Sequence, residues 1–151
     1  MDYMKAAQAF GFLERQSQNY ITMACTKMEV SYSEYVLLSE LLDHEGIRQD
    51  DMAAILCVDK AQVTRTIKSL ETKGFVYRVR SEADKRVRFV YSTERAKQEQ
   101  AYMNRLLNEW IQYLTSGMEE KVIEDVLHGL EQLGERAKNA NLGKLLAKLN
   151  P

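Results

Sequence analysis

The chain contains few of the residues that interrupt helices. Its 151 residues include one proline, Pro151, and seven glycines. Because proline and glycine are the residues least compatible with a helix interior, their scarcity favours a fold built from long helices. The hydrophobic fraction of 45% and the charged fraction of 28% are ordinary for a folded protein. A chain of this length can bury a core without disulfide bonds or a structural metal.

Cysteine and histidine are also scarce. Cys25 and Cys57 form no C-x-x-C motif, and His44 and His128 have no neighbouring ligands at a metal-binding spacing. These absences argue against a disulfide framework and a zinc site, so we expect no metal and no cofactor. We expect both cysteines to be buried and unreactive, although oxidation of Cys57 could disturb the helix that follows it.

Motifs of catalysis and of membrane insertion are missing as well. The sequence has no glycine-rich phosphate loop, no G-x-S-x-G and no H-E-x-x-H, which predicts that the protein is not an enzyme. Charges interrupt every apolar segment, so no stretch could span a bilayer. The start of the chain does not resemble a secretory signal. We therefore expect a cytoplasmic protein that does not bind membranes.

Charge is distributed unevenly along the chain. The formal net charge is −1, yet residues 60–88 contain nine basic and three acidic residues and carry a net charge of +6. The remaining residues must therefore sum to −7. A basic segment within an acidic chain is typical of a surface that contacts phosphates, although a charge run by itself is more often only a solvated face.

Apolar spacing predicts helices in the first half of the chain. Residues 3–27 carry an apolar stripe at alternating steps of three and four. A second helix is expected to begin with Ser33 as its N-cap, with Ser31 as the alternative, and to end near Gly46. Ile47 could form a very short strand before a helix over 49–56. Asp59 is a good N-cap for a basic helix that runs to about Lys73 and is closed by Gly74.

The period then changes from helical to alternating. Residues 75–80 and 87–91 are rich in β-branched and aromatic types and predict a β-hairpin. Helical spacing returns after Thr93 and is interrupted at Ser116-Gly117. From Met118 onward, apolar residues lie on two helix faces and continue as leucines almost to the end of the chain. Two apolar faces indicate a helix held between its own domain and a partner chain, or one buried deep within a single domain.

Two helices, a tight turn and a basic hairpin form the pattern of a winged helix-turn-helix. In such a module the second helix lies in the major groove of DNA. The second helix here has an apolar side for packing, and its opposite side carries polar and basic residues. Arg65 could pair with guanine, Gln62 with adenine, and Ala61 or the Thr64 methyl with a thymine methyl. The residues predicted to contact phosphates are Lys60, Thr66 and Lys68, and those predicted to reach a minor groove or flanking phosphates from the hairpin tip are Lys85, Arg86 and Arg88.

The segment from Val58 to Arg78, VDKAQVTRTIKSLETKGFVYR, resembles the recognition-helix signature of the MarR family of bacterial regulators. Asp84-Lys85-Arg86 is similar to the D-x-R motif of that family's wing. The sequence after the wing departs from the family pattern at Ser92-Thr93-Glu94-Arg95-Ala96. The resemblance implies a homodimer that binds palindromic DNA operators and is often released from them by a small aromatic or phenolic effector.

The predicted fold is therefore mainly α-helical, with a small hairpin wing on a winged helix-turn-helix and a helical dimerisation layer. We expect an N-terminal dimerisation helix over 1–32, the DNA-binding domain over 33–92 and C-terminal dimerisation helices over 93–151. The serious alternative is a winged helix that docks on protein instead of DNA. The aromatic and methionine residues that could line an effector pocket, or equally form the core, are Tyr20, Met23, Tyr35, Met103 and Trp110.

Overall fold

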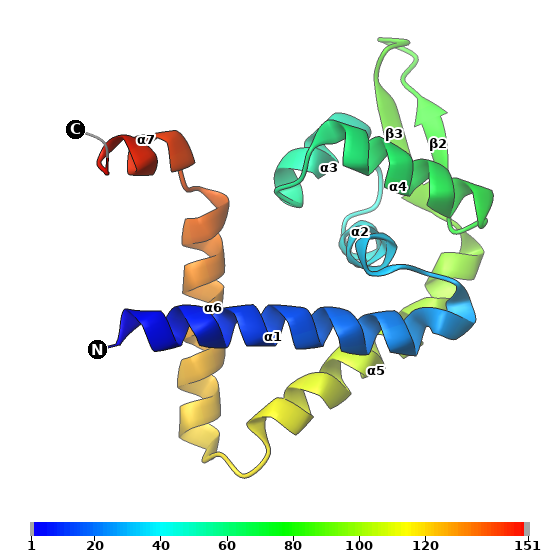
Figure 1. The fold of residues 1–151 in the computed structure, drawn as a ribbon. Helices are drawn as coiled ribbons and strands as arrows, with labels where there is room; N and C mark the ends of the chain where they lie inside the picture. Colours follow the sequence, from blue (N-terminus) through cyan, green and yellow to red (C-terminus); the bar gives the residue numbers. More distant parts are fainter. Residues whose placement is uncertain (1, 150–151) are drawn as a thin grey trace. The chain divides into compact units, whose positions relative to one another are not determined.

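The computed structural model describes residues 2–149 and consists mostly of helices (Figure 1). The elements in chain order are α1 (Tyr3–Ala24), the 3-10 helix η1 (Cys25–Met28), α2 (Tyr32–Asp43), β1 (Ile47–Arg48), α3 (Gln49–Ile55), α4 (Lys60–Thr72), β2 (Val76–Arg80), β3 (Arg88–Ser92), α5 (Glu94–Thr115), α6 (Glu120–Lys138) and α7 (Leu142–Ala147). This order confirms the predicted fold class, a mainly α-helical winged helix-turn-helix with a small hairpin.

The three strands form one antiparallel sheet in the order β1-β3-β2. The hairpin pairs Val76 with Ser92 and Arg80 with Arg88, while Ile47 of β1 pairs with Val90 of β3. The end of the hairpin extends away from the helices (Figure 1). The short strand expected at Ile47 is thus present, and it attaches the start of α3 to the base of the wing.

The start of α2 differs from the prediction. Its N-cap is Ser31 and not Ser33, because Ser31 and Glu34 form a reciprocal capping box. The backbone N–H of Ser31 donates to Glu34 Oε2 at 2.7 Å, and Glu34 N–H donates to Ser31 Oγ at 3.3 Å. The glutamate at position 34 follows the serine at position 31 by three positions, which is the S-x-x-E spacing that this motif requires.

The chain divides into two compact units, one up to Tyr113 and one from Leu114. The first unit contains the whole buried core, to which α2, α4, the sheet and α5 contribute. Its fully buried large side chains include Phe75, Leu38, Ile67, Leu70 and Met103. In the second unit, neither α6 nor α7 has a buried residue. Among residues 2–149, no helix has the length and apolar character needed to cross a membrane.

Candidate nucleic-acid interface

Helix α4 begins and ends at the residues that the sequence indicates. Asp59 Oδ1 accepts a hydrogen bond from Gln62 N–H at 2.8 Å and so caps the first turn. Gly74 follows the helix with φ +76°, a left-handed conformation that glycine adopts without steric cost. The helix therefore has the boundaries expected of it, Asp59 as the cap and Gly74 as the stop.

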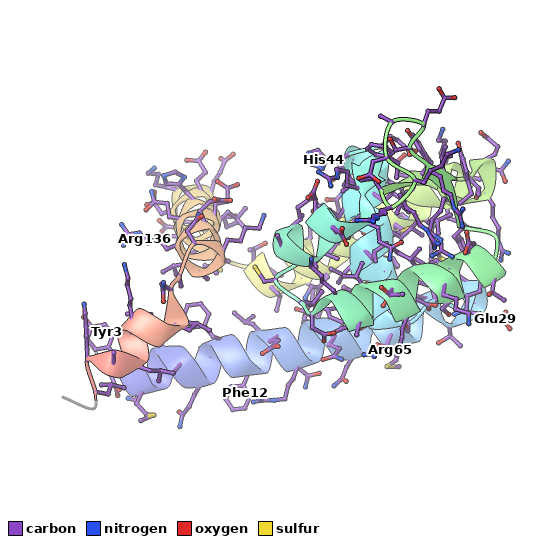
Figure 2. All side chains as sticks on the ribbon, turned by 90° about the horizontal axis from the view of Figure 1, so that it is seen from above. Tyr3, Phe12, Glu29, His44, Arg65 and Arg136 are labelled. Carbon is purple, nitrogen blue, oxygen red and sulfur yellow. The ribbon has the colours of Figure 1, made fainter. Side chains whose placement is uncertain are left out.

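The two sides of α4 have opposite chemistry. Val63, Ile67 and Leu70 are at most 1% exposed and pack into the core of the first unit. The other side is accessible and mostly polar or basic, and Arg65 on it can be located in Figure 2. The exposed side chains of the predicted DNA-contacting set on this helix are Lys60, Ala61, Thr64, Arg65 and Lys68.

Two predicted contact residues on α4 have a different environment. Gln62 is partly buried, and Thr66 is only 9% exposed. Both line a cavity of about 310 Å³ behind the helix. The prediction that Thr66 contacts a DNA phosphate does not fit its burial, because a side chain that is 9% exposed has little surface to offer a phosphate.

The turn before α4 contains an exposed cysteine in an unusual conformation. Cys57 has φ +53° and an exposed side chain, so the expectation that both cysteines are buried is wrong for this one. Cys25 is buried as expected, and its burial raises the pKa of its thiol. A positive φ is normally a glycine conformation, because a side chain with a Cβ adopts it only at a steric cost.

The hairpin presents basic residues at its tip. Lys85 and Arg86 are exposed, and Arg88 is partly buried at the start of β3. The turn is shaped by Asp84, whose Oδ1 accepts the backbone N–H of Arg86 at 2.9 Å. The contact of Asp84 is thus with the backbone amide of Arg86.

An ion pair fixes the wing against α4. Arg78 of β2 donates to Glu71 of α4 through Nη2 at 2.5 Å and through Nε at 3.3 Å. This hydrogen bonding, with a smaller contribution from the nearby charge of Arg88, holds the pKa of Glu71 below its ordinary value. The pairing is bidentate, and this geometry fixes the relative orientation of the two side chains as well as stabilising the contact. The wing and the recognition helix are therefore held in one arrangement.

A second ion pair attaches the end of α4 to the start of α2. Lys73 Nζ donates to both carboxylate oxygens of Glu34 at 2.8 Å and to the Glu29 carbonyl oxygen at 2.6 Å. Burial alone would raise the pKa of Glu34, but hydrogen bonds from Lys73, Ser31 and Ser69 outweigh it and lower the pKa. The side chain of Glu34 is only 5% exposed. This carboxylate thus belongs to the framework that orients α4.

Sequence reasoning missed two residues that lie between α4 and the wing. Gln49, the first residue of α3, donates through Nε2 to Thr64 Oγ1 of α4 at 3.2 Å. Together with Arg48 it also lines a cavity of about 210 Å³ that includes Arg86 and Arg88 of the wing. No sequence motif marks Arg48 or Gln49. Their position follows only from the pairing of β1 with β3.

The aromatic and methionine residues considered for an effector pocket mostly form the core. Tyr35 and Met103 are buried, and Tyr35 Oη donates to the Met103 carbonyl at 3.2 Å. Tyr20 and Trp110 stack with ring centroids 5.0 Å apart, whereas Met23 is 77% exposed. Within residues 2–149, no group of three or more His, Cys, Asp and Glu side chains is arranged to hold a metal ion.

Comparison with known proteins agrees with this geometry. The MarR family matches residues 30–87, which contain α2, the helix-turn-helix and the wing up to the start of β3. The HTH-type transcriptional regulator YybA of Bacillus subtilis (strain 168) is 24% identical over 129 residues, which are 83% of this chain and 86% of that protein.

Solved structures show the same fold over nearly the whole chain. A MarR transcriptional regulator from Methanosarcina mazei Go1 superposes with a TM-score of 0.85 and 27% identity, over 89% of this chain and 96% of that one. FabT of Streptococcus pneumoniae, solved in complex with DNA, gives a TM-score of 0.78 and 20% identity over 91% of this chain and 99% of that one. The capped basic helix, the wing and these matches together show that residues 30–87 form a winged helix-turn-helix domain of the MarR family of transcriptional regulators.

Proposed function

We propose that this regulator binds double-stranded DNA sequence-specifically, as a homodimer on a pseudo-palindromic operator. The observation that carries the proposal is the exposed face of α4, which is polar and basic where a protein-docking face would be apolar. FabT, which has the same fold, was solved bound to DNA. A regulator of this family has no catalytic role to perform, and we expect it to act in the cytoplasm, where DNA is accessible.

The DNA contacts proposed for α4 divide by chemistry into base-reading and phosphate-binding groups. Arg65 can donate two hydrogen bonds to guanine, and Gln62 can pair with adenine. Thr64 Oγ1 is already engaged with Gln49 and with the Lys60 carbonyl oxygen at 2.9 Å, so its methyl group is left for a thymine methyl, as is that of Ala61. The residues proposed to hold phosphates are Lys60 and Lys68 on α4 and Lys85, Arg86 and Arg88 on the wing.

Selection of bound duplexes from a random DNA library tests the proposal. We expect enrichment of an inverted repeat whose half-sites are about 10 base pairs apart, or a multiple of that. With the selected site in hand, Arg65→Ala should weaken specific binding by about 1–3 kcal/mol and relax the preference at one base position. Lys68→Ala should weaken binding to all sequences alike and lower the salt slope by about one unit per half-site.

The alternative function, docking on another protein, predicts a different result of the library selection. If that were the role of α4, the library would yield no sequence above non-specific binding. Equal losses on specific and random DNA for both variants would contradict the division of roles between Arg65 and Lys68. Each result is measured by fluorescence anisotropy with labelled duplexes over a range of salt concentrations.

The homodimer is proposed because the chain leaves large apolar surfaces uncovered. Leu142, Leu146 and Leu149 are between 61% and 75% exposed, and Tyr3 and Phe12 of α1 are 78% and 63% exposed. A monomer rarely exposes so many large apolar side chains on its terminal helices. We propose that segments 1–32 and 93–151 form the dimerisation layer and that 33–92 forms the DNA-binding domain.

A small-molecule effector is proposed from the cavity of about 310 Å³ behind α4. Its size suits a small ligand, and it extends from Glu14 of α1 through Val36 of α2 to Gln62 and Thr66 of α4. A ligand seated there would touch the recognition helix directly. The Glu14 carboxylate disfavours anions and can accept from a phenolic hydroxyl, so we propose a neutral phenol.

Ligand response is tested with a panel of simple phenols. A phenol that raises the melting temperature and releases the selected DNA would support the effector, and Val36→Phe, which fills the cavity, should abolish both effects. Val36 is only partly buried, so the variant should still fold. A response that survives in Val36→Phe would place the ligand elsewhere.

A further inference from the structure

We propose that Arg48, outside the predicted contact set, forms with the arginines of the wing a binding site for one DNA backbone phosphate, and that Gln49 links this site to the recognition helix. This inference rests on the proposed DNA-binding function and names a contact in it. It is carried by the polar cavity of about 210 Å³ lined by Arg48, Gln49, Asp50, Arg86, Val87 and Arg88.

The cavity lies between the two elements that would enter the grooves. On one side, Gln49 is hydrogen-bonded to Thr64 on the exposed face of α4. On the other side, the lining comes from the wing, at Arg86 to Arg88. If α4 occupies a major groove and the wing an adjacent minor groove, the DNA strand that separates those grooves must pass between them. A phosphate of that strand would therefore lie at this cavity.

The charges around the cavity favour an anion. Three arginines and one carboxylate, that of Asp50, are among its lining residues, so the lining carries a net charge of +2. Asp51 lies beside it, with Oδ2 3.9 Å from Arg48 Nε. Both side chains of that pair are about half exposed, so the attraction is screened by water and yields to a phosphate. Guanidinium groups are suited to phosphate because they offer several N–H donors in a plane.

Capping does not explain the arginine at position 48. It is the N-cap residue of α3, yet it makes no side-chain capping hydrogen bond. Serine, threonine, aspartate and asparagine are the residues that favour this position, and arginine is not. Opposite strands of the wing also place Arg80 directly across from Arg88. Like charges at paired positions destabilise a sheet, and they are tolerated where an anion neutralises them.

Gln49 provides a second and independent indication. Its Oε1 is buried and has no hydrogen-bond partner among residues 2–149, while its Nε2 is used by Thr64. A buried carbonyl oxygen without a donor is unfavourable. An arginine that closes on a phosphate in this cavity can donate to that oxygen with an N–H not used by the phosphate. Binding of the backbone would then be coupled to the orientation of Thr64 on α4.

The experiment measures binding of the selected duplex by wild type, Arg48→Ala and Arg48→Lys over a range of salt concentrations. Arg105→Ala is the matched control, because Arg105 is also exposed and pairs loosely with a carboxylate, Glu109, at 4.0 Å. Since Arg105 lies in the proposed dimerisation layer, sedimentation must show that this variant has the oligomeric state of the wild type. Loss of one phosphate contact in each half-site should lower the salt slope of the dimer by about two units, which near 0.1 M salt corresponds to roughly a sixtyfold loss of affinity. Arg48→Lys should recover most of that slope.

Single methylphosphonate substitutions in the duplex locate the phosphate. Wild type should lose affinity at one backbone position in each half-site, between the major-groove and minor-groove contacts, and Arg48→Ala should be indifferent to that same substitution. Binding of Arg48→Ala that equals that of Arg105→Ala would overturn the phosphate site and leave the regulator function standing. A wild type that prefers no sequence, but loses salt dependence with Arg48→Ala, would overturn the regulator function and leave the site standing.

Discussion

The recognition helix and the C-terminal helices show opposite ways of using apolar residues. On α4, every large aliphatic side chain is buried in the core of its own chain, as Val63, Ile67 and Leu70 show. On α6, the aliphatic residues Val122, Val126 and Leu130 are 41–43% exposed, and no residue of that helix is buried. Helices in water obtain most of their stability from packing of an apolar face. The first region is thus complete within one chain, whereas the exposed side chains of the second are those that the proposed dimer would cover.

The largest expected effect is on the region that lacks a core. Removing the chain from Leu142 onward should produce a monomer, and a monomer engages only one half-site of an inverted repeat. Because linked binding of two half-sites gains 10²–10⁴ in affinity, we expect a loss of about a hundredfold or more on the operator. Sedimentation reports the oligomeric state and anisotropy the affinity.

A single substitution tests the same dimerisation layer without removing a segment of the chain. Leu145→Glu places a charge among the exposed leucines, whereas Lys144→Glu adds a carboxylate at an exposed polar position next to it. Dimer loss in the first variant alone would support the proposed layer. A truncated chain that remains a stable dimer would contradict it.

Large-to-small substitutions should distinguish the two regions. Only in the second region should the loss of stability depend on the protein concentration. Ile67→Ala should lower the free energy of unfolding by about 2–5 kcal/mol at any protein concentration, because the cavity it leaves lies inside one chain. Leu127→Ala should have an effect only where the dimer is populated, since Leu127 is 36% exposed within its own chain. Urea denaturation at two protein concentrations distinguishes these cases. A concentration-dependent effect of Ile67→Ala would contradict the comparison.

The buried Glu34–Lys73 pair should stabilise the first region in a pH-dependent way. Glu34→Gln is expected to cost about 1–3 kcal/mol, the range for hydrogen bonds to charged groups. The folded-state pKa of Glu34 lies below its ordinary value of 4.5. The contribution is therefore complete above that value and is lost as the pH falls through the folded-state pKa. Denaturation at several pH values should show the two proteins converging in acid.

The matched control for that prediction lies on α6. Lys121 and Asp125 approach to 3.0 Å, but their side chains are 73% and 67% exposed. Exposed ion pairs are screened by water, so Asp125→Asn should change stability far less than Glu34→Gln. Equal effects of the two substitutions would mean that burial does not account for the strength of the Glu34 pair.

The sequence predicted the elements more accurately than the contacts between them. Asp59 and Gly74 delimit α4 because caps act locally, and local rules are visible in a sequence. The choice between Ser31 and Ser33 went wrong because both are good caps, and only the glutamate at position 34 decides between them. Thr66 was assigned to the DNA face because helical periodicity does not resolve a residue at the boundary between two faces.

The remaining part of the site depends on contacts between distant segments. Arg48 precedes its partner in the wing, Phe89, by about 40 residues and reaches it only through the register of β1 with β3. No local pattern encodes such a pairing when the strand has two residues. Glu34 and Lys73 are likewise 39 residues apart, and nothing in either sequence neighbourhood identifies the other partner.

The smallest expected effect concerns the turn that joins α3 to α4. Cys57 adopts φ +53°, which costs a residue with a Cβ of the order of 1 kcal/mol relative to glycine. Cys57→Gly relieves this cost but also makes the unfolded chain more flexible, so we expect a net stabilisation of no more than about 1 kcal/mol. Cys57→Ala removes the same thiol and keeps the Cβ, so it should give no gain. Thermal denaturation of both variants decides whether the backbone is responsible, because equal stabilisation by the two substitutions would assign the effect to the thiol instead.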